Sequence, residues 1–477
     1  MKFTSALLAA VPMVMAAPEN EKVTWLPNVG DITGFNLYSG YVNIPGTSKQ
    51  IHYMFNESKS NPSTDPVLVW TNGGPGCSSM LGWLQEHGPY QMPSGDPDMR
   101  FFENQYSWNL EMNTLYIEQP AGVGYSYCEG LQDCSFDDEQ SGADNLAAVL
   151  AWFEKYPEFK SNELYISGES YGGIYVPYLT YNLVQHAEAN AENDDVFKPN
   201  IKGFAVGNGV TNWTYDTNAA FVEMSYWHSL IPTELHDKIT AAECNYAGPY
   251  YTETTAECFG LLDEFESYVS DINVYDIYGT CWGLGPAPQM YGSTEQGHHY
   301  RKFISQNEYT PWLKRPVGTG YDGQPILKEL PPCTWGSGLL DWMNLSDTRK
   351  ALNIPDNVQA WDLCQSGDWW HYVIQPKGSQ WIYEELMGKV RMLHFSGDTD
   401  GAVPTLGTQN WIATTGWEVD QEWTPYFVDA QVAGYTETYA DGGFTFGTVH
   451  GAGHMAPQFK PPQTYHLVMN WILGRDI

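Results

Sequence analysis

Residues 164–173 read LYISGESYGG, and the class of fold follows from this stretch. A short apolar run from Leu164 to Ile166 leads into Gly168-x-Ser170-x-Gly172, and a segment compatible with a helix comes next. A strand that turns sharply into a helix leaves little room for side chains beside the turn, which favours glycine on both sides of the serine. A serine in this setting projects its hydroxyl at the carboxyl edge of a sheet, close to a helix N-terminus. The stretch therefore predicts a nucleophilic serine at Ser170.

Four further apolar runs, rich in β-branched or aromatic residues, predict buried strands. They are residues Val67–Trp70, Thr114–Ile117, Gly203–Val206 and Met392–Phe395. Between two of the runs, apolar residues from Leu146 to Phe153 recur at helical spacing before Pro157. Strands that alternate with helices are typical of a largely parallel sheet covered by helices. We expect an α/β fold with a central, mostly parallel sheet flanked by helices.

From about Trp213 to Asp341 the alternation gives way to aromatic-rich sequence punctuated by glycine and proline. This region carries Cys244, Cys258, Cys281 and Cys333. Irregular sequence between two predicted strands indicates an insertion on the surface of the main domain. We expect a cap subdomain over roughly residues 213–341.

Composition excludes some classes of partner. The 477 residues are 42% hydrophobic, enough for a large core. The 22 Lys and Arg residues against 57 Asp and Glu residues give a formal net charge of −35, which opposes binding to nucleic acids or anionic lipid surfaces. The acidity fits either plain solubility or an acidic compartment, where repulsion between carboxylates is weaker.

The first residues have the layout of a secretory signal. Lys2 precedes an apolar run that ends in the small residues Ala16 and Ala17. The run is shorter than the roughly 20 apolar residues of a membrane-spanning helix, and no later segment qualifies. We expect a signal peptide over residues 1–16, cleaved after Ala16 or Ala17, and a mature domain of 17–477 that is secreted or delivered to a lysosome or vacuole.

An oxidising compartment makes the eight cysteines candidates for disulfides. The sequence contains no Cys-x-x-Cys pair, the motif that would indicate zinc binding or thioredoxin chemistry. Glycosylation sequons begin at Asn56, Asn212 and Asn344, which are expected glycan acceptors.

A nucleophilic serine needs a histidine that takes its proton and an acid that orients the histidine, and in this kind of fold the acid comes first along the chain. The run at 392–395 leads to Asp398 and Asp400, and the chain later reaches His450 and His454. Each segment holds two candidates. The glycine-rich loop around His454 favours it as the base.

Three segments resemble one family. They read NGGPGCSS at residues 72–79, GESYGG at 168–173 and GAGHMAP at 451–457. Together they resemble the serine carboxypeptidases of the α/β-hydrolase fold, in particular the plant-like and lysosomal members. The resemblance extends from about Trp25 to Ile477, and residues 119–126 and 207–209 support it.

The resemblance implies a catalytic triad of Ser170, Asp400 and His454, with Asp398 as a structural neighbour. It also implies an oxyanion hole formed by the backbone N–H groups of Gly74 and Tyr171. A glycine-rich loop and the residue after the nucleophile are both able to present such groups. The resemblance implies no cofactor and no metal.

Recognition of a free substrate carboxylate is implied for four residues: Asn72, Gly73, Glu86 and Glu169. Two neighbouring carboxyl groups do not easily both ionise, so they share a proton. A protonated pair is able to donate a hydrogen bond to the substrate carboxylate. We therefore expect hydrolysis of the C-terminal bond of peptides and proteins at acidic pH, through an acyl-enzyme on Ser170.

The resemblance also suggests disulfides that join Cys77 to Cys364, Cys244 to Cys258, Cys281 to Cys333 and Cys128 to Cys134. The sequence alone allows 105 pairings of eight cysteines. Three alternatives to a peptidase remain: an acyltransferase of the same family, a more remote hydroxynitrile lyase, and a protective scaffold without catalysis. The glutamate pair favours the peptidase. The sequence fits a monomer or a homodimer.

Overall fold

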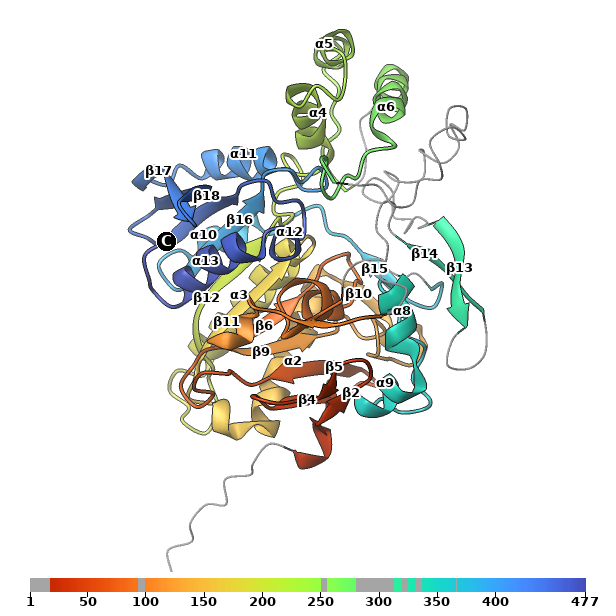
Figure 1. The fold of residues 1–477 in the computed structure, drawn as a ribbon. Helices are drawn as coiled ribbons and strands as arrows, with labels where there is room; N and C mark the ends of the chain where they lie inside the picture. The colour runs from red at the N-terminus through yellow and green to blue at the C-terminus, as the bar shows by residue number, and fades with distance from the viewer. Residues whose placement is uncertain are drawn as a thin grey trace, which may run out of the picture.

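The computed structural model describes residues 18–92, 99–249, 255–279, 313–319, 325–330, 337–365 and 367–477, with 313–319 and 325–330 described by their backbone alone. Within these residues one sheet of eleven strands runs through the molecule, and helices lie against it (Figure 1). The strand order is β1-β4-β5-β9-β6-β11-β12-β16-β19-β18-β17. The predicted α/β architecture is confirmed.

The centre of the sheet is parallel. It consists of β9 (Asn113–Ile117), β6 (Val67–Thr71), β11 (Glu163–Glu169), β12 (Asn200–Gly207), β16 (Arg391–Gly397) and β19 (Phe444–Val449). The five apolar runs predicted as strands all lie in these strands. The predicted helix lies in α2 (Asp138–Lys155). Parallel strands are buried on both faces, which is why they are visible as continuous apolar runs.

Both edges of the sheet are antiparallel, and their strands were not predicted. One edge holds β1 (Lys22–Val23), β4 (Leu37–Asn43) and β5 (Gln50–Asn56), and the other holds β18 (Gln431–Tyr439) and β17 (Val419–Val428). Polar residues interrupt the pattern in β4 and β5. Ser39 and His52, for example, are buried and lie 2.9 Å apart at Oγ and Nε2. Most of β17 is exposed and needs no apolar run.

Alternate residues of the central strands enter two buried clusters. Leu164 and Ile166 belong to one, whereas Tyr165 belongs to the other. Full burial of such a side chain contributes about 1.5–3 kcal/mol. The first cluster is completed by α2, α3 (Gly172–Ala189), α10 (Gln380–Leu386) and α11 (Thr405–Thr415). The second is completed by η2 (Gly82–Glu86), α8 (Ser337–Asn344) and α13 (Pro461–Ile472).

Shorter elements connect this framework. They are η1 (Glu19–Glu21), β2 (Trp25–Leu26), β3 (Gly30–Asp31), β7 (Tyr90–Gln91), β8 (Phe102–Glu103), η3 (Trp108–Leu110), α1 (Gly130–Asp133), β10 (Ser135–Asp137), η4 (Pro157–Phe159), β13 (Leu313–Thr319), β14 (Pro325–Leu330), α9 (Ser346–Ala351), β15 (His371–Val373) and α12 (Ala456–Phe459).

Three helices between β12 and β16 lie beyond one end of the parallel strands (Figure 1): α4 (Asn218–Trp227), α5 (Thr233–Ala241) and α6 (Ala256–Val269). They share a buried cluster of their own that includes Phe221, Leu235 and Phe265. The expected cap ends near residue 341, inside α8, yet Leu340 and Met343 pack in the second core cluster of the main body. We therefore propose that the insertion ends before α8.

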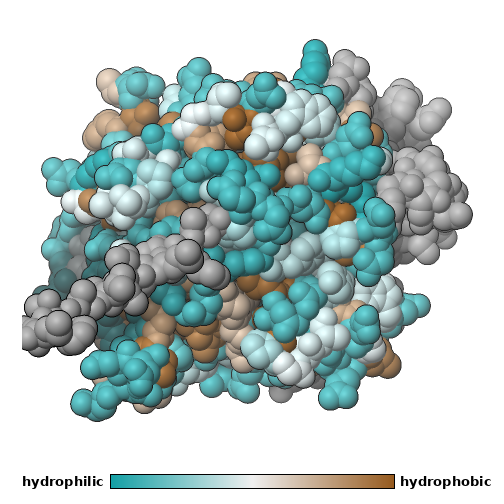
Figure 2. Space-filling model, turned by 90° about the horizontal axis from the view of Figure 1, so that it is seen from below, coloured by the Kyte–Doolittle hydropathy of each residue, from teal (hydrophilic) through white to brown (hydrophobic). Residues whose placement is uncertain are grey.

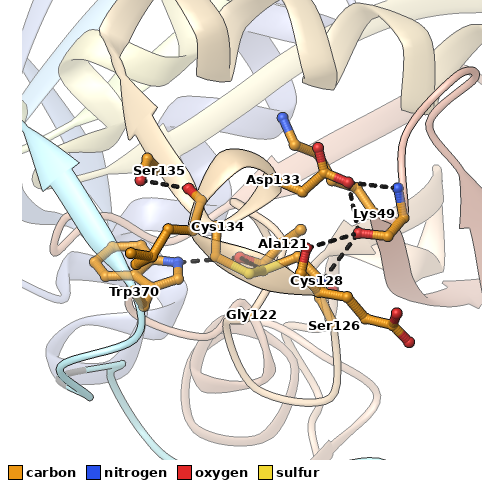
Figure 3. The surroundings of a disulfide bond; sticks show 12 residues. Lys49, Ala121, Gly122, Ser126, Cys128, Asp133, Cys134, Ser135 and Trp370 are labelled. Carbon is orange, nitrogen blue, oxygen red and sulfur yellow. Dashed lines mark hydrogen bonds between the residues drawn. A yellow bond between two sulfur atoms is a disulfide. The ribbon is translucent and has the colours of Figure 1, made fainter.

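Three of the four expected disulfides lie within the described residues, and each is present: Cys77–Cys364, Cys128–Cys134 and Cys244–Cys258. Cys281 and Cys333 lie outside the described residues, as does the expected signal peptide over 1–16. Figure 3 shows the surroundings of Cys128–Cys134, where Trp370 Nε1 donates to the carbonyl of Ala121 across 3.0 Å.

Two of the three sequon asparagines are buried. Asn56 is 0% exposed, and its amide nitrogen donates to Thr114 Oγ1 across 2.9 Å. Asn344 is 5% exposed and donates to the carbonyls of Leu340 and Trp361. A glycan on either nitrogen is incompatible with this packing, so the structure argues against both sites. Asn212 is partly exposed, and we propose it as the remaining acceptor.

Hydrophilic residues predominate on the face shown in Figure 2, and hydrophobic residues form scattered patches there. Among the described residues, no helix has the length and apolar character needed to cross a bilayer.

Candidate active site

Ser170 occupies the sharp turn between β11 and α3. Its φ angle is 62°, in the left-handed region that disfavours residues other than glycine. The turn is held from both sides, because the Ser170 N–H donates to the Gly207 carbonyl across 3.1 Å and the Ser170 carbonyl accepts from the N–H of Gly173 and of Val210. The side chain is partly exposed at the carboxyl end of the strand. The local structure is therefore the predicted elbow.

The glycines of the elbow are not equivalent. A Cβ atom added to Gly168 would lie 2.4 Å from the Thr71 carbonyl oxygen, and one added to Gly173 would lie 2.2 Å from the Val210 carbonyl oxygen. At Gly172 the nearest atom would be 3.4 Å away, an ordinary contact. Close packing of backbone thus requires glycine at Gly168 and Gly173, whereas Gly172 has room for a methyl group.

Asp400 and His454 form a buried pair. His454 Nδ1 lies 2.7 Å from Asp400 Oδ2, and the two residues are 3% and 0% exposed. The same carboxylate accepts hydrogen bonds from the N–H groups of Ala402 and Val403 and from Asn208 Nδ2. These donors fix the orientation of the carboxylate. His454 Nδ1 is thereby occupied, which leaves Nε2 for proton transfer.

The other acid and histidine of the two segments pair with each other. His450 Nδ1 lies 2.7 Å from Asp398 Oδ2, and Asp398 Oδ1 also accepts the N–H of Gly451 across 2.6 Å. The His450 side chain is 65% exposed, so solvent screens this pair. The two acids and two histidines thus form two separate pairs. Asp400 and His454 are buried, whereas the pair of Asp398 and His450 is exposed to solvent.

The segment 273–277, which follows α6, contacts the loops that carry Asp400 and His454. The Tyr275 carbonyl accepts the N–H of His454 across 2.6 Å, and the Val274 carbonyl accepts the N–H of Gly401 across 2.7 Å. The Ile277 N–H donates to the Thr399 carbonyl across 3.0 Å, and Thr399 Oγ1 donates to Asp276. The acid loop and the base loop are therefore joined by one segment of the inserted region.

Asn72, Glu86 and Glu169 form a buried cluster beside the elbow. Asn72 Nδ2 donates to Glu169 Oε1 across 2.8 Å and to Glu86 Oε1 across 3.0 Å. The orientation of the Asn72 amide is determined by its other end, because Oδ1 accepts from Trp70 Nε1 and from the Gly82 N–H. The NH₂ group must then face the two carboxyl groups.

Burial raises the pKa of both glutamates. The Glu86 carboxyl, beside Glu169, raises the pKa of Glu169 further, and the Asn72 amide offsets part of the effect for each. The Oε2 atoms of both residues have no hydrogen-bond partner among the described residues. Two buried acceptors without donors are costly, and a proton on the pair removes part of that cost. The pair is thus suited to hold a proton and to donate it in a hydrogen bond.

The loop at 72–79 lies against the elbow. A Cβ atom on Gly73 would be 2.3 Å from the Tyr171 nitrogen and 2.7 Å from Ser170 Cβ, so only glycine permits this approach. Gly74 has a φ of 113°, a conformation that also favours glycine. Among the described residues, the N–H groups of Gly74 and Tyr171 donate to no backbone carbonyl. Both remain available for a substrate oxygen.

Comparison with known proteins agrees with this geometry. A family model described as serine carboxypeptidase matches residues 27–474. The chain belongs to the serine carboxypeptidase family. It is a hydrolase and an exopeptidase, as the sequence predicted. It is 32% identical to serine carboxypeptidase 1 of Hordeum vulgare, over 97% of this chain and 94% of the relative.

Two other comparisons extend the picture of this carboxypeptidase. It is 31% identical to the lysosomal protective protein of Mus musculus, over 96% of this chain and 94% of the relative. The crystal structure of a prohormone-processing carboxypeptidase from Saccharomyces cerevisiae superposes with a TM-score of 0.71 at 19% identity, covering 96% of this chain and 97% of the other. That similarity supports the α/β-hydrolase fold.

Two buried polar residues, whose roles were not predicted, also support the site of this carboxypeptidase. Asn208 is buried, donates to Asp400 and accepts the Gly397 N–H across 2.9 Å; its signal was its place between Gly207 and Gly209. Glu118 is buried under the 72–79 loop, where it accepts hydrogen bonds from Ser78 Oγ and from Trp361 Nε1. In the sequence, the sole signal for Glu118 is the apolar run that precedes it, which places it at the end of a predicted strand.

Proposed function

We propose that this serine carboxypeptidase removes single residues from the C-termini of peptides and proteins, through an acyl-enzyme on Ser170 and preferentially at acidic pH. The observation that carries the proposal is the Asn72 amide, which donates to Glu86 and Glu169 directly beside the nucleophile. An endopeptidase does not need to bind a free carboxylate beside the cleaved bond. A carboxypeptidase must bind the carboxylate one residue beyond that bond, and this cluster offers donors for it.

In the acylation step, Ser170 Oγ attacks the carbonyl carbon of the last peptide bond, and its proton passes to His454 Nε2. The Asp400 carboxylate stabilises the imidazolium that forms. The C–N bond then breaks, and His454 gives the proton to the departing amino group. Water repeats the sequence on the acyl-enzyme, which releases the shortened peptide and restores the Ser170 hydroxyl.

The N–H groups of Gly74 and Tyr171 would stabilise the negative charge that develops on the substrate oxygen. Each donor of this kind accounts for about 10²–10³ in kcat. The Gly73 N–H, Asn72 and the protonated glutamate pair would bind the substrate carboxylate. Because the pair donates only while it holds its proton, substrate binding should weaken as the pH rises through the raised pKa of the pair.

The compartment follows from the same chemistry. We propose delivery through the secretory pathway, to the exterior or to a lysosome or vacuole. The disulfides, the lysosomal protective protein among the relatives and the acid preference of the glutamate pair support this.

The test measures kcat and KM for blocked dipeptides and their C-terminal amides between pH 4 and 8. We expect free acids to be cleaved far faster than amides, and KM to rise towards neutral pH. In Glu86→Gln with Glu169→Gln, which keeps an uncharged donor, KM should vary much less with pH. Glu57→Gln is the matched control, because the Glu57 pKa is also raised by burial while its partners are Asn36 and Tyr38.

Equal cleavage of acids and amides would exclude carboxylate recognition, and an unchanged pH profile in the double variant would exclude the role of the pair. Labelling of Ser170 by an organophosphate separates both outcomes from a scaffold without catalysis. Transfer of the acyl group to added alcohols in preference to water would favour the acyltransferase instead.

A further inference from the structure

The side chain of Tyr171 is anchored to a buried carboxylate. Tyr171 follows the nucleophile directly, is 2% exposed, and its hydroxyl donates to Asp138 Oδ1 across 2.6 Å. Asp138 is the first residue of α2 and is 1% exposed. The residue whose N–H we assign to the oxyanion hole is thus held at its far end by a different element.

Asp138 has two further donors. Tyr372 donates through its hydroxyl to the same oxygen, Oδ1, across 2.8 Å, and the Gln375 N–H donates to Oδ2 across 3.1 Å. Burial raises the pKa of Asp138 to about 6, although these three hydrogen bonds lower it. Burial of a carboxylate costs free energy, and the three hydrogen bonds that offset this cost also hold the Asp138 carboxylate in one position.

Capping of α2 does not explain the acid at Asp138. The N-cap is Asp137, whose Oδ1 accepts the Gln140 N–H across 2.8 Å. Asp138 instead points its carboxylate at two tyrosines from other parts of the chain: Tyr171 in the turn before α3, and Tyr372 in β15. The Asp138 carboxylate therefore contacts residues next to the elbow and does not cap α2.

Aromatic contacts fix the Tyr171 ring as well. The rings of Tyr175 and Tyr372 meet it edge to face, with centroids 5.1 Å and 5.6 Å away. A ring held by such contacts and by a hydrogen bond at its hydroxyl has little freedom to rotate or shift. The peptide unit at the start of this side chain shares that restraint.

We propose that Asp138 is a positioning residue for catalysis: through the Tyr171 hydroxyl it holds the Tyr171 N–H in place for the developing oxyanion. The inference rests on the proposed function, since it requires that N–H to be an oxyanion donor. Donors of this kind act because they are already in place when charge develops, so a small displacement costs rate. Ground-state binding of substrate, which uses the Asn72 cluster, should change little.

The test compares Tyr171→Phe with Tyr372→Phe. Both remove one hydroxyl from Asp138 Oδ1 and keep an aromatic ring, but only Tyr171 carries the peptide unit beside Ser170. We expect Tyr171→Phe to lower kcat about 10-fold to 100-fold, with KM within about twofold, because part of one oxyanion donor is lost. Affinity for a peptidyl aldehyde, which forms a tetrahedral adduct, should fall by the same factor. Tyr372→Phe should change both quantities less than about threefold.

Asp138→Asn provides a second, independent test of the same hydrogen bond. If the two residues act through one hydrogen bond, the double variant with Tyr171→Phe should lose no more kcat than the more severe single variant. Equal losses in Tyr171→Phe and Tyr372→Phe, or a rise in KM at constant kcat, would overturn the inference. Thermal unfolding identifies any variant that fails to fold, in which case Tyr171→Phe alone decides.

Failure of the proposed function has a different signature. If the wild-type enzyme cleaves C-terminal amides as well as acids, carboxylate recognition is wrong, yet the kcat comparison of the two tyrosine variants still holds for the amide substrate. If Tyr171→Phe keeps the wild-type kcat while acids remain preferred, only the positioning role is wrong.

Discussion

The backbone N–H of His454 donates to the carbonyl oxygen of Tyr275 across 2.6 Å, so the proposed catalytic base is fixed by a residue of the segment that follows α6. The rings of the two residues also lie close, with centroids 5.2 Å apart. Segment 273–277 contacts the Asp400 loop at the same time. We therefore propose that this segment aligns Asp400 with His454.

Gly453→Ala tests this alignment. A Cβ atom at Gly453 would lie 2.2 Å from the Tyr275 carbonyl oxygen, so the segment or the His454 loop must move. We expect kcat/KM to fall more than about tenfold and the melting temperature to drop, because overpacking costs about 1–3 kcal/mol. The control is Gly260→Ala in α6, where no atom lies within 4 Å of the added methyl group. This control substitution should raise the free energy of unfolding by about 0.5–1 kcal/mol, because alanine is favoured over glycine inside a helix. Full activity in Gly453→Ala would contradict the role of the segment.

Exchange of each histidine distinguishes the two His–Asp pairs. His454→Gln should lower kcat by on the order of 10⁶-fold, because the nucleophile loses its general base. His450→Gln should change kcat less than about threefold, since its exposed pair with Asp398 contributes little. Steady-state rates on one blocked dipeptide decide the matter. A large loss in the His450 variant with little loss in the His454 variant would reverse the assignment.

Stability should increase towards acidic pH. Burial raises the pKa of Asp216 to about 7 and that of Asp138 to about 6, and it also raises the pKa of Glu86 and Glu169. A carboxyl group whose pKa is higher in the folded state binds its proton more tightly there. Its contribution to stability is therefore complete below the unfolded pKa near 4 and is lost as the pH rises through the folded pKa.

The free energy of unfolding, measured with urea at constant ionic strength, should thus fall between pH 4.5 and 7.5. Asp216→Asn should flatten the curve by on the order of a few kcal/mol, since one pKa unit corresponds to about 1.4 kcal/mol. The net charge of −35 acts in the same direction at neutral pH. A curve that rises with pH would show that other groups dominate.

Removal of single disulfides should have unequal effects. Cys77–Cys364 spans 287 residues and anchors the 72–79 loop, whereas Cys128–Cys134 spans 6. Removal of a crosslink that closes a longer loop returns more conformational entropy to the unfolded chain. A variant with both Cys77→Ser and Cys364→Ser should therefore lose about 2–5 kcal/mol of its free energy of unfolding, and its kcat should also fall. The pair Cys128→Ser and Cys134→Ser should be milder in both respects. Chemical denaturation and steady-state kinetics test the two effects separately.

The parts predicted from sequence were those encoded locally. Five of the six central parallel strands were visible because burial on both faces demands continuous apolar runs, and the elbow was visible because its glycines are required by close backbone contacts. The antiparallel edges were missed because buried polar residues such as Ser39 and His52 depend on each other across the sheet. Nothing local in the sequence marks such a partner.

The same reason explains what was missed in the site. The motif glycines and the glutamate beside Ser170 could be named in advance. Asn208 behind Asp400, Tyr275 above His454 and Asp138 behind Tyr171 could not, because each acts through a contact between distant segments. The sequons show the converse, since a local motif does not distinguish the buried Asn56 and Asn344 from the partly exposed Asn212.

The contacts of segment 273–277 also bear on the order in which activity arises during synthesis. Ser170 and its elbow are translated early, but their base requires β16, β19 and the loop that follows β19, together with a segment of the inserted region. If Ser170 and His454 act as we propose, a nascent or incompletely folded chain has a nucleophile without a base. We therefore expect hydrolytic activity to appear only after these distant parts of the polypeptide have packed together.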